Sequence, residues 1–167
     1  MAYALIILAV ACRLLPHPPN ATPVLAVALL SGAVLPRRTA WLVPLAALVA
    51  SDAAVGYGFS WMSLVCYTCF SASVFLGRWL CRGGWKNRIA ASLAGSTLFF
   101  LVTNFAVWAS WPGMYTHTVI GMGHCYLSAL PFFRNAVIGD LLWMAAVFGA
   151  YELTMRVAEA RSPIEMA

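Results

Sequence analysis

The chain has 167 residues, of which 63% are apolar and only 9% are charged, and its mean hydropathy is +0.85. A soluble domain carries about 25% charged residues, so the composition excludes a soluble fold and equally excludes a disordered chain. The net charge of +5 is spread along an apolar chain, which argues against a nucleic-acid-binding protein. We therefore expect an integral membrane protein, with the lipid bilayer as its surroundings and with no soluble catalytic domain.

Long uncharged stretches, separated by Pro and Gly clusters, predict an all-α membrane protein with six transmembrane helices. They form one domain over residues 1–158, followed by a short cytoplasmic tail at 159–167. The helices are expected at Ala2–Leu15, Thr22–Leu35, Ala40–Val55, Trp61–Leu80, Ile89–Trp111 and Arg134–Arg156. The first three are shorter than the roughly 20 residues that a crossing helix needs. A long apolar loop is expected over residues 112–133.

Basic residues predict the orientation of this bundle, because Lys and Arg collect in cytoplasmic connections. Eight of the ten basic residues fall in the second connection, around the fourth connection, or after the last helix: Arg37, Arg38, Arg78, Arg82, Lys86, Arg88, Arg156 and Arg161. With six helices, both termini then also lie in the cytoplasm. The other three connections face outwards.

Polar residues collect towards the outer side of the predicted bundle. A charge inside a bilayer costs about 2.5–3.5 kcal/mol on insertion scales, so such residues usually pair or line a polar cavity. Asp52, Arg134 and Asp140 are therefore candidates for an outward-facing pocket, although Arg134 paired with one Asp could equally stabilise the fold. Further polar candidates on this side are His17, Tyr57, Asn104 and Trp108.

Two cysteines, Cys66 and Cys69, lie three residues apart on the fourth predicted helix. A C-x-x-C motif can indicate thiol redox chemistry, but a disulfide within one regular helix is strained. A metal site could also be formed with His117, His124 or Cys125, which fall in the expected loop after Trp111. A cysteine in a membrane helix can equally be a small apolar packing residue.

Several segments resemble the substrate-binding (S) components of energy-coupling-factor (ECF) vitamin transporters, which are small bacterial membrane proteins with six helices. The resemblance spans residues 12–150 and is carried by RLLPHPPNATPV at 13–24, SD at 51–52, TNFAVW at 103–108, PFFRN at 131–135 and GD at 139–140. Within that family, the helix cysteine, the His of the first loop, the helix Asp and the late Arg are most similar to the solitary cobalamin (vitamin B12) transporters of the BtuM type. The resemblance implies a multi-pass protein of the bacterial inner membrane.

The resemblance also implies a function, with cobalamin as the ligand and substrate. Cys66 would ligate the cobalt and promote removal of its cyanide, and Cys69 is the fallback ligand if the register of this helix differs. Near the ligand, the matching polar residues are His17, Asp52 and Arg134. Weaker matches are Tyr57, Asn104 and Trp108.

Energy coupling stays open at the level of sequence. The chain contains no G-x-x-x-x-G-K-[ST] loop, so we expect no nucleotide to bind to it. It would either dock on an ECF coupling module or act alone. The alternative functions are an S component for another small vitamin or a metal ion, and a membrane thiol redox enzyme that uses Cys66 and Cys69.

Overall fold

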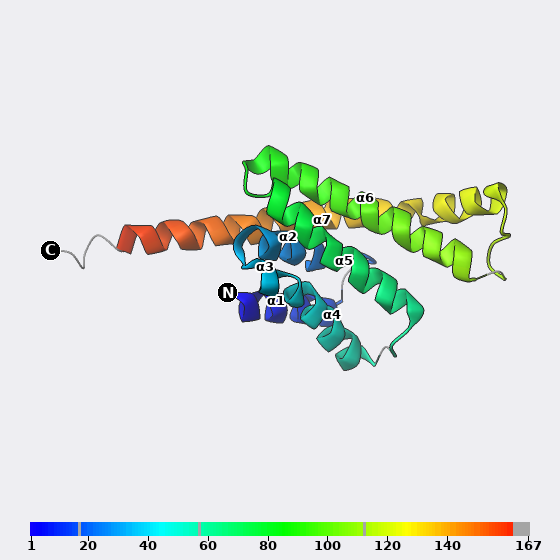
Figure 1. Cartoon of the computed structure of the whole chain (residues 1–167), viewed down its shortest axis with the longest axis horizontal. Coiled ribbons are helices and arrows are strands. Elements are labelled where there is room, and N and C mark those ends of the chain that lie inside the picture. The colour runs from blue at the N-terminus through cyan, green and yellow to red at the C-terminus, as the bar shows by residue number, and fades with distance from the viewer. Residues whose placement is uncertain (17, 57, 112, 162–167) are drawn as a thin grey trace.

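The computed structural model describes residues 1–16, 18–56, 58–111 and 113–161. Over these residues the chain is helical and has no strand, so the expected all-α class is confirmed. The helices are α1 (Ala2–Leu14), α2 (Val24–Val34), α3 (Arg37–Ala40), α4 (Leu42–Val55), α5 (Trp61–Leu80), α6 (Trp85–Ser110) and α7 (Val119–Arg161) (Figure 1).

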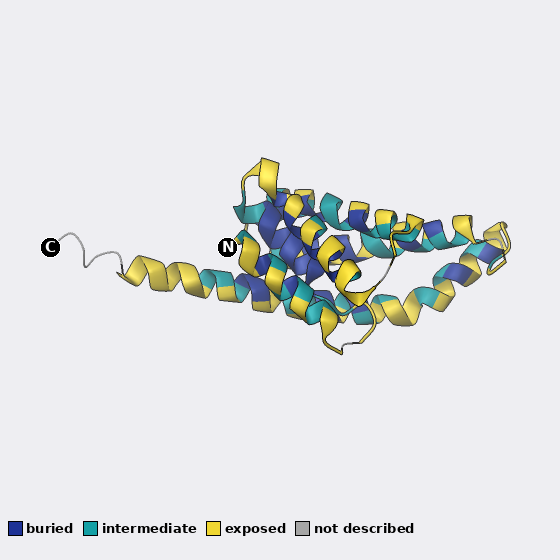
Figure 2. Ribbon diagram, turned by 90° about the horizontal axis from the view of Figure 1, so that it is seen from below, coloured by how far each residue is buried: buried dark blue, intermediate teal, exposed yellow. Residues whose placement is uncertain are grey.

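Four helical segments are long and apolar enough to cross a membrane. They are Arg37–Val55, which joins α3 and α4, together with α5, α6 and α7. These helices carry many large apolar residues that are exposed, as expected for contact with lipid. Exposed residues follow the outer sides of the helices (Figure 2). α1 and α2 are shorter apolar helices, so a bundle that crosses six times stays a prediction.

α2 lies at the centre of the bundle and packs against α1, α4, α5, α6 and α7. Its residues from Val24 to Leu30 are at most 2% exposed. A helix that is apolar all round is stable only when other elements surround it, which is the position that α2 takes. At 1.5 Å per residue α2 spans about 16 Å, about half of the hydrocarbon core of a bilayer.

The closest helix contact is the crossing of α2 and α5, where glycines let the two backbones touch. A Cβ atom on Gly77 would lie 2.1 Å from the carbonyl oxygen of Leu29, and one on Gly32 would lie 2.0 Å from that of Val74. No side chain fits at either position. Small residues allow membrane helices to pack by close van der Waals contact, since lipid offers no hydrophobic driving force between them.

The start of α1 and the end of α7 lie at the same end of the bundle (Figure 1). This end also carries α3, the adjoining ends of α5 and α6 with the turn between them, and the end of α7, which together hold the eight clustered basic residues. An ion pair joins two helices here, with Arg88 Nη1 2.5 Å from Glu152 Oε1. The Arg88 guanidinium also lies 4.8 Å from the ring centre of Phe148 and 5.0 Å from that of Trp85.

α7 differs most from the helix that the sequence predicts. The last helix was expected to begin at Arg134, but α7 begins at Val119 and continues through Pro131. His124 and Cys125 therefore lie on a helix and not in a loop. A proline inside a helix removes one backbone hydrogen bond, but membrane helices tolerate it because neighbours satisfy the freed group. At the other end α7 continues to Arg161, into the expected tail, and residues 162–167 lie outside the described part.

Candidate functional site

A cavity of about 430 Å³ lies in the half of the bundle away from the basic turns. Side chains of α1, α2, α4, α5, α6 and α7 and of two connecting segments form its walls. Among the lining residues are Arg13, Asn20, Leu25, Leu48, Asp52, Ser63, Cys66, Tyr67, Phe70, Phe99 and Asp140. The cavity thus combines aromatic walls with one basic and two acidic side chains, Arg13, Asp52 and Asp140, as small-molecule sites often do.

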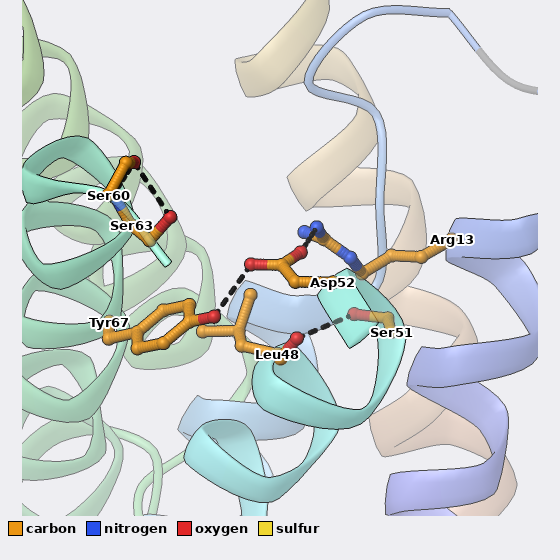
Figure 3. A network of polar contacts seen from close by, with 7 residues as sticks. All are labelled: Arg13, Leu48, Ser51, Asp52, Ser60, Ser63 and Tyr67. Carbon is orange, nitrogen blue, oxygen red and sulfur yellow. Dashed lines mark hydrogen bonds and ion pairs between the residues drawn. The ribbon is translucent and has the colours of Figure 1, made fainter. Parts of the chain in front are cut away.

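The start of α5 is set by a cap that also orients its cavity-facing residues. Ser60 Oγ accepts a hydrogen bond from the backbone N–H of Ser63 at 3.1 Å, and Ser is among the preferred residues at this position (Figure 3). Residues three and four apart share one face of a helix, so Ser63, Cys66 and Tyr67 all line the cavity.

Asp52 is held at the cavity by two partners from different helices (Figure 3). Arg13 Nη2 forms an ion pair with Asp52 Oδ1, and the Tyr67 hydroxyl donates a hydrogen bond to Asp52 Oδ2 at 2.7 Å. The side chains of Arg13 and Asp52 are only 21% and 14% exposed. Asp52 lies in the last turn of α4, where the helix dipole disfavours a negative charge, and the Arg13 guanidinium offsets this cost.

Arg13 retains a polar atom that nothing described in the protein uses. Its Nε atom is buried and has no hydrogen-bond partner among the described residues. Buried polar groups are normally hydrogen-bonded, so an unpaired donor beside a cavity is suited to an acceptor on a ligand or to a water molecule.

A second cavity of about 240 Å³ adjoins the first and reaches between α6 and α7. The two share Asn20, Met62, Cys66, Phe99 and Ala136. Cys66 therefore borders both spaces. Asn104 lines the second cavity, and its amide Nδ2 donates to the carbonyl oxygen of Phe100 at 2.7 Å.

Asp140 is the most deeply buried charged residue of the first cavity, at 6% exposure. Its Oδ2 atom lies 2.7 Å from the hydroxyl oxygen of Ser96 on α6. Among the residues that the structure describes, no Lys, Arg or His forms an ion pair with it.

The structure brings together four of the residues predicted for the site: Asp52, Cys66, Asn104 and Asp140. Trp108 and Arg134 line neither cavity. Trp108 Nε1 instead donates to the carbonyl oxygen of Thr116 at 3.0 Å, with its ring 5.5 Å from that of His117. Arg134 is exposed on α7.

The remaining residues predicted for the site are His17, Tyr57 and Cys69. His17 and Tyr57 lie outside the described residues. Cys69 is buried one turn deeper on α5 and lines neither cavity, and both it and Cys66 are free thiols. No group of three or more His, Cys, Asp or Glu side chains gathers as a metal site in the described part of the chain.

Two cavity residues, Arg13 and Tyr67, were not predicted from the sequence. The distribution of charge offered a signal for Arg13, because with eight basic residues at the other end only Arg13 and Arg134 could pair with an outer acid. Arg13 is the partner of Asp52, and Arg134 is not. No pattern in the sequence singled out Tyr67, which meets Asp52 only because α4 packs against α5.

A family model described as "Family of unknown function (DUF6580)" matches residues 1–162. The chain belongs to the DUF6580 family. No curated protein and no solved structure matches this DUF6580 protein. Its function must therefore be argued from the cavity itself.

Proposed function

We propose that this DUF6580 protein is a membrane-embedded binding and uptake protein for a small vitamin-like molecule, similar to the S components of ECF transporters. The observation that carries the proposal is the cavity, which places Arg13, Asp52, Cys66 and Asp140 inside an apolar helical bundle. Ionisable residues inside a membrane protein are costly and usually mark the path of a substrate or an ion.

The position of the cavity supports uptake from outside the cell. It lies in the half of the bundle opposite the clustered basic residues, and basic connections face the cytoplasm. The proposal therefore has both termini in the cytoplasm, the cavity facing outwards, and α1 and α2 completing a six-helix bundle in a bacterial inner membrane.

We propose cobalamin as the first ligand to test, because Cys66 borders both cavities. A thiolate is a soft ligand that suits a transition metal, and a thiol that coordinates a metal is deprotonated outright. Its sulfur would give an electron pair to Co(III) as the lower benzimidazole nitrogen leaves, and the added electron density would labilise cyanide on the opposite face. Cyanide would leave with its own electron pair and take up the proton of the Cys66 thiol, so this ligand exchange requires no reductant.

The size of the cavity favours a second candidate, a smaller vitamin. Sites for drug-sized ligands measure about 300–1,000 Å³, and the main cavity falls at the small end of that range. A corrinoid would fill the cavity with one edge and extend beyond it. A smaller vitamin could be enclosed, with the unpaired Arg13 Nε and the Asp140 carboxyl as its polar contacts.

The deciding experiment is an absorbance spectrum of the detergent-purified protein after incubation with cyanocobalamin and gel filtration. We expect corrinoid to co-elute with a spectrum shifted from the cyano form in the wild type. Cys66→Ala should abolish the shift. Cys69→Ala is the matched control, because Cys69 lies on the same helix but lines neither cavity, and it should behave as the wild type.

Other outcomes would separate the two candidates. Co-elution with an unshifted spectrum would retain cobalamin binding and refute cobalt ligation by Cys66. If no corrinoid co-elutes with any variant, cobalamin is refuted, and thermal stabilisation by a panel of small vitamins then tests the second candidate. Uptake with an ECF module and uptake by this chain alone both involve no nucleotide binding by the chain itself. In the first case the ECF module would supply the ATPases.

A further inference from the structure

Ser96 has more hydrogen-bond partners than its single hydroxyl hydrogen can serve. Its Oγ atom lies 3.0 Å from the carbonyl oxygen of Ser92 and 2.7 Å from Oδ2 of Asp140, and both contacts are buried. The Ser92 carbonyl and an ionised Asp140 can only accept. One hydrogen cannot complete both bonds at full strength, and a protonated carboxyl group would supply the second hydrogen.

A protonated Asp140 satisfies all three groups. The carboxyl O–H then donates to Ser96 Oγ, and the Ser96 hydroxyl donates to the Ser92 carbonyl. The 2.7 Å separation is typical of an O–H···O bond. An ionised Asp140 would instead be a buried charge with no cationic partner among the described residues, and burying an unpaired charge is strongly unfavourable.

Asp52 shows what an ionised carboxylate requires in the same cavity. It receives hydrogens from two donors, the Arg13 guanidinium and the Tyr67 hydroxyl, and Arg13 also supplies the opposite charge. Asp140 has neither a full set of donors nor a counter-charge within the described part of the chain.

The groups that face Asp140 come from all the helices around the cavity. The titratable or charged ones are Arg13 from α1, Asp52 from α4, and Cys66 and Tyr67 from α5. α2 contributes Leu25 and α6 contributes Phe99 to the lining, so neither adds a charge there. The positive charge of Arg13 is already paired with Asp52.

We propose that Asp140, with Ser96, is a proton-binding site that opens to the cavity and exchanges its proton with it. The carboxyl releases a proton to water or to an incoming ligand, becomes a carboxylate, and regains the proton from the same space. In an uptake cycle that takes this proton from the outward cavity and releases it on the cytoplasmic side, the site would couple substrate movement to a proton gradient. The coupling rests on the proposed function, whereas the proton site itself does not.

Infrared spectroscopy of the detergent-purified protein tests the proton site without any ligand, because a protonated carboxyl absorbs at a higher frequency than a carboxylate. At pH 7 we expect a protonated-carboxyl band in the wild type that shifts in D₂O. Asp140→Asn should lose the band, and the matched variant Asp52→Asn should keep it. A band absent from the wild type at pH 7, or one that persists in Asp140→Asn, would overturn the proton site. A band that does not shift in D₂O would overturn exchange with the cavity.

Stability gives a second readout. An Asn amide can donate to Ser96 Oγ as a protonated carboxyl does, so Asp140→Asn should unfold close to the wild-type temperature. Ser96→Ala removes the acceptor and should shift the carboxyl band of Asp140. An unshifted band in Ser96→Ala would refute the hydrogen-bond arrangement.

Coupling is tested in proteoliposomes with cyanocobalamin as the probe. An acidic outer solution should raise the initial uptake rate several-fold in the wild type, and the gradient should have no effect in Asp140→Asn. Uptake that ignores the gradient in the wild type would refute coupling. A complete lack of uptake in every variant would refute cobalamin transport, and the infrared band would still decide the proton site.

Discussion

The two halves of the bundle differ in how their helices meet. Near the basic turns, α2 and α5 touch backbone to backbone at Gly32 and Gly77. In the other half, larger residues such as Tyr67, Phe70 and Phe99 hold the helices apart around a cavity. The comparison indicates that one half supplies the packing that stabilises the fold, while the other uses that stability to bury polar groups.

The largest expected loss of stability comes from adding a side chain at the tight crossing of α2 and α5. Gly77→Ala should lower the free energy of unfolding by about 2 kcal/mol or more, because the new Cβ meets the rigid backbone of Leu29 at 2.1 Å. The measurement is the apparent melting temperature in detergent, determined from the loss of the monodisperse gel-filtration peak after heating.

Gly149→Ala is the matched control for that substitution. Gly149 also lies inside a helix, but a Cβ there meets nothing within 4 Å. Alanine favours helix over glycine by roughly 0.5–1 kcal/mol, so this variant should be as stable as the wild type or more so. Equal melting temperatures for the two variants would contradict the tight packing of α2 against α5.

A smaller loss is expected from the ion pair beside the cavity. Asp52→Asn leaves the mostly buried Arg13 without its counter-charge and should cost about 1–3 kcal/mol, less than for a fully buried pair. The double variant Arg13→Gln with Asp52→Asn should recover part of this loss. If the double variant is as unstable as the sum of both single variants, the two residues do not interact.

The smallest effect is expected for the ion pair at the basic end. Glu152→Gln should cost about 1 kcal/mol or less, because Glu152 is 31% exposed and solvent screens the pair. Arg88 also keeps its contacts with the rings of Phe148 and Trp85. A loss larger than that of Asp52→Asn, measured by the same melting assay, would reverse the comparison between the two ends.

Much of the fold follows from local patterns that a sequence displays. Helix boundaries set by Pro and Gly clusters are predicted within a few residues for α1, α2, α4 and α5. α7 is the exception, since the last helix was expected to begin at Arg134, whereas α7 begins at Val119 and continues through Pro131. Proline acts locally, but its cost depends on partners that a linear pattern does not show.

In the candidate site, too, local sequence patterns predicted some residues, and the partners of these residues depend on tertiary packing. Asp52 was predicted because a carboxylate is costly in an apolar helix, and Cys66 because of its C-x-x-C motif and the resemblance to S components. Both line the cavity. Their partners could not be predicted in the same way, because the contacts of Asp52 with Arg13 and Tyr67 span 39 and 15 residues of sequence.

The sequence by itself determined the class of this protein, its helices and its charge asymmetry, because hydropathy and chain breakers act over short distances. Only the tertiary structure decided which charges are neutralised and which are not. Asp52 and Asp140 are the same side chain in the same cavity, but one meets a guanidinium and a phenol and the other meets a single serine hydroxyl. The helix packing sets that difference, because it decides which side chains from other helices each carboxyl group meets.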